Sequence, residues 1–227
     1  MSRTIGAVSA LPVDRLLVGI TGTLGIYDFL YYVEAFRGTV AKEIRVIHTP
    51  TASRFIDPQI VSMIVGCEVW TDFWDERDGV RVPHAELPEW AQMFIVIPAT
   101  VNTLSLVARG DASGLLHASV LGSPRPVGFV PNMKQSLWRA PATRRNVAQM
   151  REDGHLVMDL DEGEYFLQPV DKSLPPDPAP SPEQIAAFVL ELARASGIEA
   201  GEDELHLAPA AEAIERIDRV RRTFGQA

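Results

Sequence analysis

Short apolar runs alternate along the chain with longer segments in which apolar residues recur at helical spacing. Apolar runs of this length, bounded by turn-forming residues, are typical of strands that are buried on both faces. They cover residues 15–20, 93–97 and 127–130. Strands are also expected at residues 43–48, which include Glu43 and Arg45, and at residues 155–158. Because helical segments separate them, the pattern predicts an α/β fold with a doubly wound parallel sheet, flavodoxin-like or Rossmann-like, in three layers.

The helices expected between these strands are short and amphipathic. They cover residues 26–36, 57–66, 104–108, 115–121 and 141–154. A further helix is expected to start near Ser181. Its apolar positions, which recur at helical spacing and should dock on the sheet, are Ile185, Phe188, Val189 and Leu192. Residues 205–224 predict a last helix that is rich in charge.

A proline-rich stretch, residues 173–182, divides the chain and should act as a stiff connector. A length of 227 residues supports one good core with an appendage rather than two full domains. We therefore expect one domain over residues 1–195, which includes the connector, and a helical C-terminal extension over residues 196–227.

Composition and charge narrow the class of protein. The net charge of −9 argues against a nucleic-acid or anionic-membrane surface, because both need a concentrated basic patch. No apolar stretch approaches the roughly 18 residues of a membrane span, and the N-terminus lacks a secretory signal, so we expect a cytoplasmic location. The single cysteine, Cys67, excludes an internal disulfide and a cysteine metal cluster, and we expect no metal. Its apolar neighbours indicate a small buried hydrophobe.

Small hydroxyl residues gather where the first three predicted strands end. Thr21-Gly22-Thr23 follows the first strand, residues 49–53 follow the second, and residues 98–103 follow the third. Since the carboxyl ends of parallel strands point the same way, these turns should line a single crevice. The hydroxyls of Thr21 and Thr23 at a helix N-terminus suit a phosphate, although a simple tight turn would have the same sequence.

Two other groups of residues have less specific interpretations. His48 has no visible partner in the sequence and is interpreted as structural. Trp70, Phe73 and Trp74 lie among acidic residues. Aromatic residues in such a setting usually cover the edge of a core, and the alternative is that they form the wall of a flat cofactor site.

Three motifs then occur in a specific order and spacing. His84 precedes Pro98 by 14 positions, and Pro98 precedes Pro131 by 33. With Pro98-Ala99-Thr100-Val101-Asn102-Thr103 and Pro131-Asn132-Met133-Lys134-Gln135-Ser136-Leu137-Trp138, the chain resembles the homo-oligomeric flavin-containing cysteine decarboxylases. The likeness, over residues 15–192, is closest to the branch that acts on lantibiotic precursor peptides. That family has an active-site His, then Pro-Ala-Ser-Ala-Asn-Thr, then Pro-x-Met-Asn-x-x-Met-Trp.

The resemblance implies a cofactor, FMN or FAD, and a role for individual residues. Those implied to hold the flavin and its phosphate are Thr21, Gly22, Thr23, Pro50, Thr51, Pro98, Ala99, Thr100, Asn102 and Thr103. His84 is implied as the catalytic base or orienting group. The residues implied to bind the substrate are Asn132, Met133, Lys134 and Trp138. Residues 159–172 correspond to a mobile flap, and residues 1–195 as a whole to a flavin-binding decarboxylase-like domain.

The implied reaction is oxidative decarboxylation of the C-terminal cysteine of a ribosomal precursor peptide, giving an enethiol for an aminovinyl-cysteine ring. An imidazole suits the proton transfers of this reaction, because it exchanges protons near neutral pH. The implied partners are the precursor peptide, other copies of the chain in a trimer or dodecamer, and other peptide-modifying enzymes.

The sequence also departs from the family pattern. Lys134 replaces the usual Asn and Leu137 the usual Met, and residues 112–116 read Ala-Ser-Gly-Leu-Leu where the family has Ala-Asp-Asn-Leu-Leu. An ammonium differs from an amide in shape and hydration. Two alternatives therefore stay open. One is a diverged flavin-binding or peptide-presenting partner protein without decarboxylase activity, and the other is a phosphopantothenoylcysteine decarboxylase.

Overall fold

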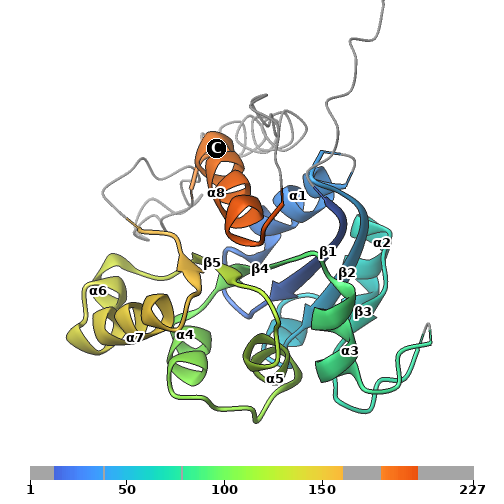
Figure 1. Ribbon diagram of the computed structural model, residues 1–227, viewed down its shortest axis with the longest axis horizontal. Coiled ribbons are helices and arrows are strands. Elements are labelled where there is room, and N and C mark those ends of the chain that lie inside the picture. The colour runs from blue at the N-terminus through green and yellow to red at the C-terminus, as the bar shows by residue number, and fades with distance from the viewer. Residues whose placement is uncertain (1–12, 38, 78, 161–179, 199–227) are drawn as a thin grey trace, which may run out of the picture.

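The computed structural model describes residues 13–37, 39–77, 79–160 and 180–198. In this part of the chain, parallel strands form one sheet in the order β3-β2-β1-β4-β5-β6 (Figure 1). The strands are β1 (Val13–Ile20), β2 (Ala41–His48), β3 (Val69–Trp70), β4 (Met93–Ala99), β5 (Val127–Pro131) and β6 (Leu156–Val157). The chain winds outward from β1 to β3 and returns to β4 on the other side of β1, so the predicted doubly wound sheet is confirmed.

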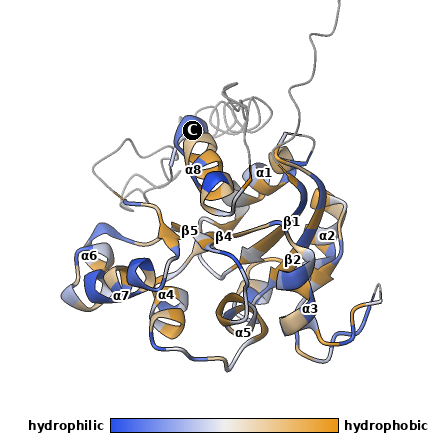
Figure 2. Ribbon diagram, viewed as in Figure 1, coloured by the Kyte–Doolittle hydropathy of each residue, from blue (hydrophilic) through white to orange (hydrophobic). Residues whose placement is uncertain are grey.

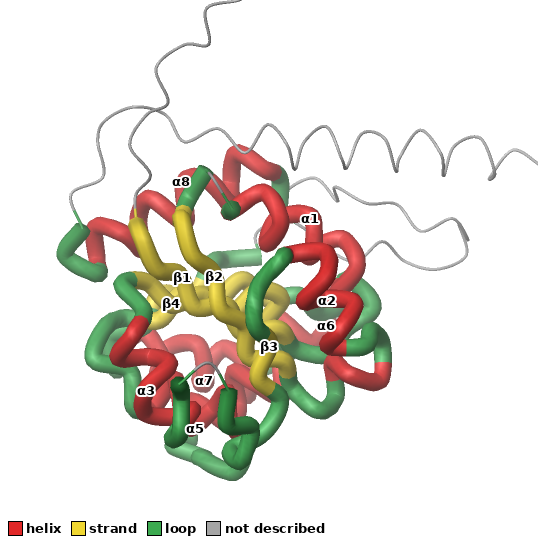
Figure 3. Tube along the Cα trace, turned by 90° about the vertical axis from the view of Figure 1, so that its right-hand side faces the viewer, coloured by secondary structure: helices red, strands yellow, loops and turns green. Residues whose placement is uncertain are grey.

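Helices cover both faces of the sheet (Figures 1 and 3). One face packs against α1 (Ile26–Phe36), α2 (Pro58–Val65) and α8 (Pro182–Ala195). The opposite face packs against α3 (Pro83–Trp90), α4 (Val101–Ala108), α5 (Leu115–Leu121) and α7 (Pro141–Glu152). Two shorter pieces, η1 (Ala52–Arg54) and α6 (Gln135–Trp138), lie in the connections.

The central strand β1 contributes to a hydrophobic core on each side of the sheet. Successive side chains of a strand point to opposite faces, so Leu16, Val18 and Ile20 join the core beneath α1, α2 and α8. Leu17 joins the core on the opposite side. Figure 2 shows apolar residues concentrated in the strands and on the sides of the helices that face them. Burial on both faces explains why β1 reads in the sequence as an almost continuous apolar run.

Helix α8 completes the first face of the sheet. Ile185, Val189 and Leu192 are 0% exposed and Phe188 is 6% exposed, which confirms the predicted docking. The helix lies close to β5, because a Cβ added to Gly128 would be 2.7 Å from Leu192 Cδ2. Its start is fixed by a capping box between Ser181 and Gln184.

Among the described residues, the hydrophobic pattern did not predict helix α3 or the three short elements η1, β3 and α6. Helix α3 carries His84, and its two prolines, which usually indicate a loop, explain why the sequence pattern did not predict it. Pro83 lies in the first turn, where a missing N–H costs nothing, and the Glu86 carboxylate accepts the N–H of Val82 at 2.7 Å. The elements η1, β3 and α6 are too short to show a period in the sequence.

Two further predictions need correction. Helix α4 begins at Val101 rather than at residue 104, so Asn102 and Thr103 lie in its first turn and not in a preceding loop. Trp70 is fully buried, but Trp74 is 86% exposed, so the prediction that Trp74 covers a core edge is wrong. Cys67 packs against the first core but is only partly buried, and burial raises the pKa of its thiol to about 12.

Several predicted segments lie outside the described residues. They are residues 161–172 of the flap, residues 173–179 of the connector and the helix over 205–224. The division into a domain over 1–195 and an extension over 196–227 therefore stays a prediction. At the start of the flap, Asp159 is exposed and its carboxylate pairs with Arg151 at 2.9 Å and Arg144 at 3.7 Å.

Candidate functional site

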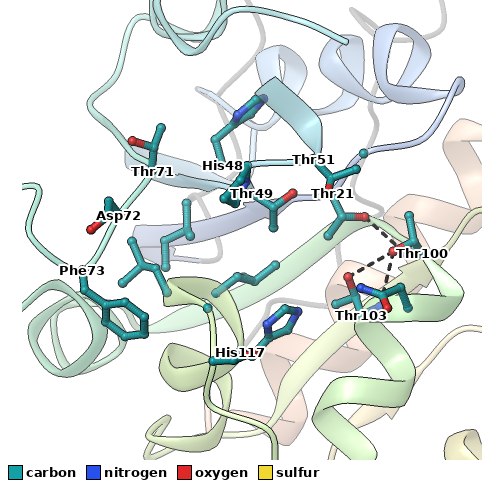
Figure 4. A pocket seen from close by; sticks show the side chains of 18 of the residues that line it. Thr21, His48, Thr49, Thr51, Thr71, Asp72, Phe73, Thr100, Thr103 and His117 are labelled. Carbon is teal, nitrogen blue, oxygen red and sulfur yellow. Dashed lines mark hydrogen bonds between the residues drawn. The ribbon is translucent and has the colours of Figure 1, made fainter. Parts of the chain in front are cut away.

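A cleft of about 400 Å³ lies at the carboxyl ends of β1, β2, β3 and β4 (Figure 4). Its lining comes from residues 21–22, 47–51, 71–73, 100–103 and 113–117. These loops converge at the point where the strand order switches between β1 and β4, which is where doubly wound sheets bind ligands. The single crevice predicted from the hydroxyl-rich turns is confirmed.

The cleft brings together most of the residues that the resemblance assigned to the cofactor. They are Thr21, Gly22, Pro50, Thr51, Thr100, Asn102 and Thr103. Pro98 and Ala99 are buried inside β4 and do not line the cleft. Thr23 does not line it either, since its hydroxyl donates to Asn132 Oδ1 at 2.5 Å.

Thr21 holds the loops after β1 and β4 together. Its hydroxyl donates to the carbonyl oxygen of Pro98 at 2.8 Å and accepts the N–H of Thr100 at 3.1 Å. The side chain is 1% exposed. Because both contacts are internal, Thr21 shapes the cleft and does not present a free hydroxyl to it.

Gly22 is required by the close approach of the loop after β2. A Cβ added there would lie 2.6 Å from Thr51 Cγ2 and 2.8 Å from the Thr51 carbonyl oxygen. Two chain segments can therefore meet at the cleft only because position 22 has no side chain.

The N-terminus of α4 forms one end of the cleft. Thr100 is the N-cap residue, and its hydroxyl accepts the N–H of Thr103 at 3.3 Å. Asn102 is exposed beside it. A helix N-terminus carries a partial positive charge and free N–H groups, and both suit an anion such as a phosphate.

Another part of the cleft wall is apolar, and two buried imidazoles also line the cleft. Ile47, Phe73, Leu115 and Leu116 supply apolar surface. His48, which is 0% exposed, pairs through Nδ1 with the Ser53 hydroxyl at 3.1 Å, and its Nε2 has no partner among the described residues. Burial lowers the pKa of His48 to about 4. The interpretation of His48 as purely structural is therefore incomplete, because its neutral ring lines the cleft.

His84 lies outside the lining of this cleft but next to it. It is the second residue of α3, and its ring meets Phe73 edge to face at a centroid distance of 5.4 Å. Phe73 itself lines the cleft, so His84 lies in a second layer in this chain. Nδ1 of His84 is buried and has no partner among the described residues.

The residues implied to bind the substrate follow β5 and do not line the cleft. Asn132 is 3% exposed and accepts the Thr23 hydroxyl. Met133 and Trp138 are buried in the second core, at 6% and 2% exposure. Lys134 is exposed and precedes α6 as its N-cap residue. Of the four residues implied to bind the substrate, the structure thus buries three and exposes Lys134.

Sequence reasoning missed several lining residues, above all His117 in α5. That helix was predicted, but its helical spacing shows a buried face and gives no sign that a polar residue there meets a cleft. Thr71 and Asp72 were missed because they follow the unpredicted strand β3. Among residues 13–160 and 180–198, apart from positions 38 and 78, no cluster of three or more His, Cys, Asp or Glu residues could hold a metal ion. No helix in the described part of the chain is long and apolar enough to cross a membrane.

Known proteins resemble this chain over most of its length. The Flavoprotein family matches residues 8–192. Mersacidin decarboxylase from Bacillus sp. is 36% identical over 157 residues, which are 67% of this chain and 77% of that protein. Its solved structure superimposes with a TM-score of 0.59, covering 65% of this chain and 84% of the other.

Two further proteins resemble this chain, one over part of its own length and the other in its fold. The coenzyme A biosynthesis bifunctional protein CoaBC of Bacillus subtilis is 32% identical over 149 residues, and the match spans 66% of this chain but only 36% of CoaBC. The structure of the decarboxylase EpiD complexed with the substrate peptide DSYTC has a TM-score of 0.68 at 19% identity, over 78% of this chain and 99% of EpiD. At that identity the likeness concerns the fold alone. With a family match over residues 8–192 and a doubly wound sheet whose switch point forms a cleft, the chain belongs to the Flavoprotein family.

Proposed function

We propose that this protein catalyses the flavin-dependent oxidative decarboxylation of the C-terminal cysteine of a ribosomal precursor peptide. The product would be an enethiol that closes an aminovinyl-cysteine ring. The observation that carries the proposal is a cleft at the switch point of the sheet, lined by Thr100, Asn102 and Thr103 of a motif shared with cysteine decarboxylases. The 36% identity to mersacidin decarboxylase supports this substrate class.

The residues of the cleft fit a flavin in two parts. Gly22, Thr51, Thr100 and Asn102 surround the N-terminus of α4, which suits the phosphate. The apolar wall near Phe73 suits a flat ring, and the unpaired nitrogens of the buried imidazoles suit its polar edge. FMN and FAD share both parts. A bound flavin accepts a hydride and so supplies the oxidising step.

The protein would bind the peptide, hold its terminal cysteine and move protons. In the proposed reaction the thiol loses a proton, Cβ is oxidised to a thioaldehyde, and loss of carbon dioxide leaves the enethiol. His84 has an unpaired buried Nδ1 next to Phe73 in the cleft wall, so we assign it to the thiol or enethiol proton. Lys134, as an exposed cation, would attract the peptide carboxylate.

The other residues of that motif would act indirectly. Asn132 accepts the Thr23 hydroxyl, and its Oδ1 would lie 2.8 Å from a Cβ added to Gly25. It therefore connects the loop after β5 to the loop after β1. Met133 and Trp138 fill the second core and would hold the loop that carries Lys134 in place.

The proposal is tested with purified protein and a peptide that ends in cysteine. We expect a yellow protein with the absorbance bands of a bound flavin. The peptide should lose a mass equivalent to formic acid in the protein's presence. A colourless protein that takes up neither FMN nor FAD would contradict the proposal. A flavoprotein that binds the peptide without changing its mass would instead favour a peptide-presenting partner protein.

The variant His84→Asn separates binding from chemistry. We expect it to bind flavin and peptide normally but to lose most of the decarboxylation, about 10²-fold or more, because Asn cannot transfer a proton. The rate of mass loss and the flavin absorbance are measured on the same sample. Full activity of the variant would remove His84 from the mechanism.

A second candidate is phosphopantothenoylcysteine decarboxylation, which the 32% identity to CoaBC favours. That substrate carries its own phosphate. The N-terminus of α4 and its hydroxyl residues form the anion site of the cleft, and we assign that site to the flavin. We therefore expect the peptide to be preferred in a side-by-side assay with the two substrates, and a higher kcat/KM for phosphopantothenoylcysteine would reverse the assignment.

We also infer a homo-oligomer, a trimer or a dodecamer, in which a neighbouring copy would complete the site around His84. Helix α2 supports this inference, because Ile60, Met63 and Ile64 are 48%, 83% and 42% exposed. Exposed apolar residues that gather on one helix are typical of a surface that another chain covers.

A further inference from the structure

His117 is a buried histidine whose imidazole has no hydrogen-bond partner among the described residues. It lies in α5, and 8% of the residue is exposed. Both ring nitrogens, Nδ1 and Nε2, are shielded and unpaired. An unpaired buried polar group destabilises a fold, so its presence calls for a partner that the described residues do not supply.

The imidazole of His117 is directed into the cleft. Figure 4 shows it between Phe73 and Thr103, on the wall opposite His48. A group bound in the cleft would therefore meet the ring, while the described part of the chain offers its nitrogens no hydrogen bond. The unpaired nitrogens belong to the binding site and not to the interior of a core.

The ring also occupies the place of a side chain that the family has and this chain lacks. Position 114 is Gly where the resembling family has Asn, and a Cβ added to Gly114 would lie 3.0 Å from His117 Nδ1 and 3.5 Å from Cε1. The imidazole of His117 thus lies close to where the side chain of an Asn at position 114 would begin. The missing side chain at Gly114 thus leaves the space that the ring of His117 occupies.

The chemistry of the imidazole matches that of the missing amide. Burial lowers the pKa of His117, with a smaller opposing effect from Asp111 and a smaller lowering effect from Arg109. At neutral pH the ring is therefore uncharged and offers one N–H donor and one lone-pair acceptor. This pairing suits a carbonyl or a nitrogen at the edge of a neutral aromatic ring better than a phosphate, for which the N-terminus of α4 is available.

We propose that His117 binds the flavin ring by a hydrogen bond and replaces the amide that is absent at Gly114. This inference rests on the flavin-binding part of the proposed function. His117 is a binding residue for the cofactor, with no part in the proton transfers assigned to His84.

The test compares His117→Leu and His117→Gln with the wild type. Leu fills the space without polar atoms, and Gln keeps one donor and one acceptor. Flavin dissociation constants are measured by titration with FMN and with FAD, followed by absorbance and fluorescence, and thermal midpoints are measured without flavin. We expect His117→Leu to raise the dissociation constant about tenfold, the effect of one lost hydrogen bond, and His117→Gln to stay within about threefold.

Without flavin, His117→Leu should melt at a higher temperature than the wild type, because it removes two unpaired buried nitrogens. Opposite effects on stability and on flavin affinity are the signature of a binding residue. A histidine with a structural role would lower the melting temperature when replaced. The control is His155→Gln, because His155 is a partly buried imidazole outside the cleft whose Nδ1 accepts the Val127 N–H. It should leave the flavin dissociation constant unchanged.

A rescue variant tests the link to position 114. Gly114 has an extended backbone, with φ −126°, that any residue adopts. His117→Leu combined with Gly114→Asn should therefore recover most of the lost affinity. A wild type that binds flavin while His117→Leu binds it equally well would overturn the inference and leave the proposed function intact. A wild type that binds neither FMN nor FAD would overturn both.

Discussion

At the scale of single residues, the cleft depends on positions where a side chain is missing or unpaired. Gly22 lets the loops after β1 and β2 meet, since an added Cβ would lie 2.7 Å from the Thr51 carbonyl carbon. Gly114 makes room for the imidazole of His117. These residues contribute little binding surface of their own, but they determine where their neighbours lie.

We therefore expect Gly22→Ala to destabilise the protein by about 1–3 kcal/mol, the usual cost of overpacking, and to weaken flavin binding at the same time. Urea unfolding and a flavin titration measure the two effects. Gly122→Ala is a milder comparison, because the nearest contact of its added Cβ beyond the adjacent residues would be the Ala118 carbonyl oxygen at 3.3 Å, against 2.6 Å at Gly22. Equal behaviour of the two variants would show that the approach of Thr51 to Gly22 does not limit the site.

At the scale of elements, the start of α4 connects the sheet to the cleft. Thr100 caps the helix with its hydroxyl, and its own N–H donates to Thr21. The anion site formed by the first turn of α4 therefore depends on a cap that is itself attached to β1. Helix α3 similarly connects His84 to the sheet, because Cζ of Arg45 in β2 lies 4.4 Å from the centroid of the Trp90 ring at the end of that helix.

The cap predicts a difference between two substitutions of Thr100. Thr100→Ser keeps the hydroxyl and should retain stability and flavin affinity. Thr100→Ala loses the hydrogen bond to the Thr103 N–H, so we expect a loss of about 1 kcal/mol of unfolding free energy and weaker flavin binding. Thermal or urea unfolding of both variants is the measurement. Equal stability of the two would show that the cap is dispensable.

At the scale of the whole molecule, buried histidines make the fold sensitive to acid. Burial lowers the pKa of His48 to about 4, from the ordinary value of 6.5, and also lowers the pKa values of His117 and His155. In each case the unfolded chain binds the proton at a higher pH than the folded chain does. The stabilisation that these neutral histidines contribute is therefore complete above about pH 6.5. It is lost as the pH falls through the lower pKa values that they have in the folded protein.

We expect the unfolding free energy to decrease steadily between pH 6.5 and about 4, the window set by His48. Urea unfolding at a series of pH values checks this. His48→Gln should flatten the profile, because its side chain does not titrate. A wild-type profile that is flat over this window would contradict the neutral state of the buried imidazoles.

The whole molecule also exposes an apolar face on α2, for which we propose a second copy of the chain as the partner. Met63 is the most exposed of its apolar residues, at 83%. We expect light scattering to show an oligomer, and Met63→Glu to shift it toward the monomer, because a buried charge in an apolar interface is costly. Met63→Leu is the matched control, since it keeps an apolar side chain at the same position. A wild-type monomer with bound flavin would contradict the inference.

The sequence alone determined the parts of the fold that follow from periodicity. The buried strands β1, β4 and β5 read as apolar runs, and α8 showed its apolar face at helical spacing, because burial on both faces or on one face leaves a regular pattern. The hydroxyl-rich turns could be placed in one crevice because parallel strands share a direction. The motifs around His84, Pro98 and Pro131 indicated the family that residues 8–192 match.

Only the tertiary structure decided which of these residues reach the cleft. It placed Met133 and Trp138 in the core, His84 behind Phe73, and His117 in the cleft wall. A one-dimensional pattern records whether a position is apolar, but not whether the space beside it is filled by the chain or left for a ligand. That depends on contacts between segments far apart in the sequence, such as Gly22 with Thr51 and Phe73 with His84.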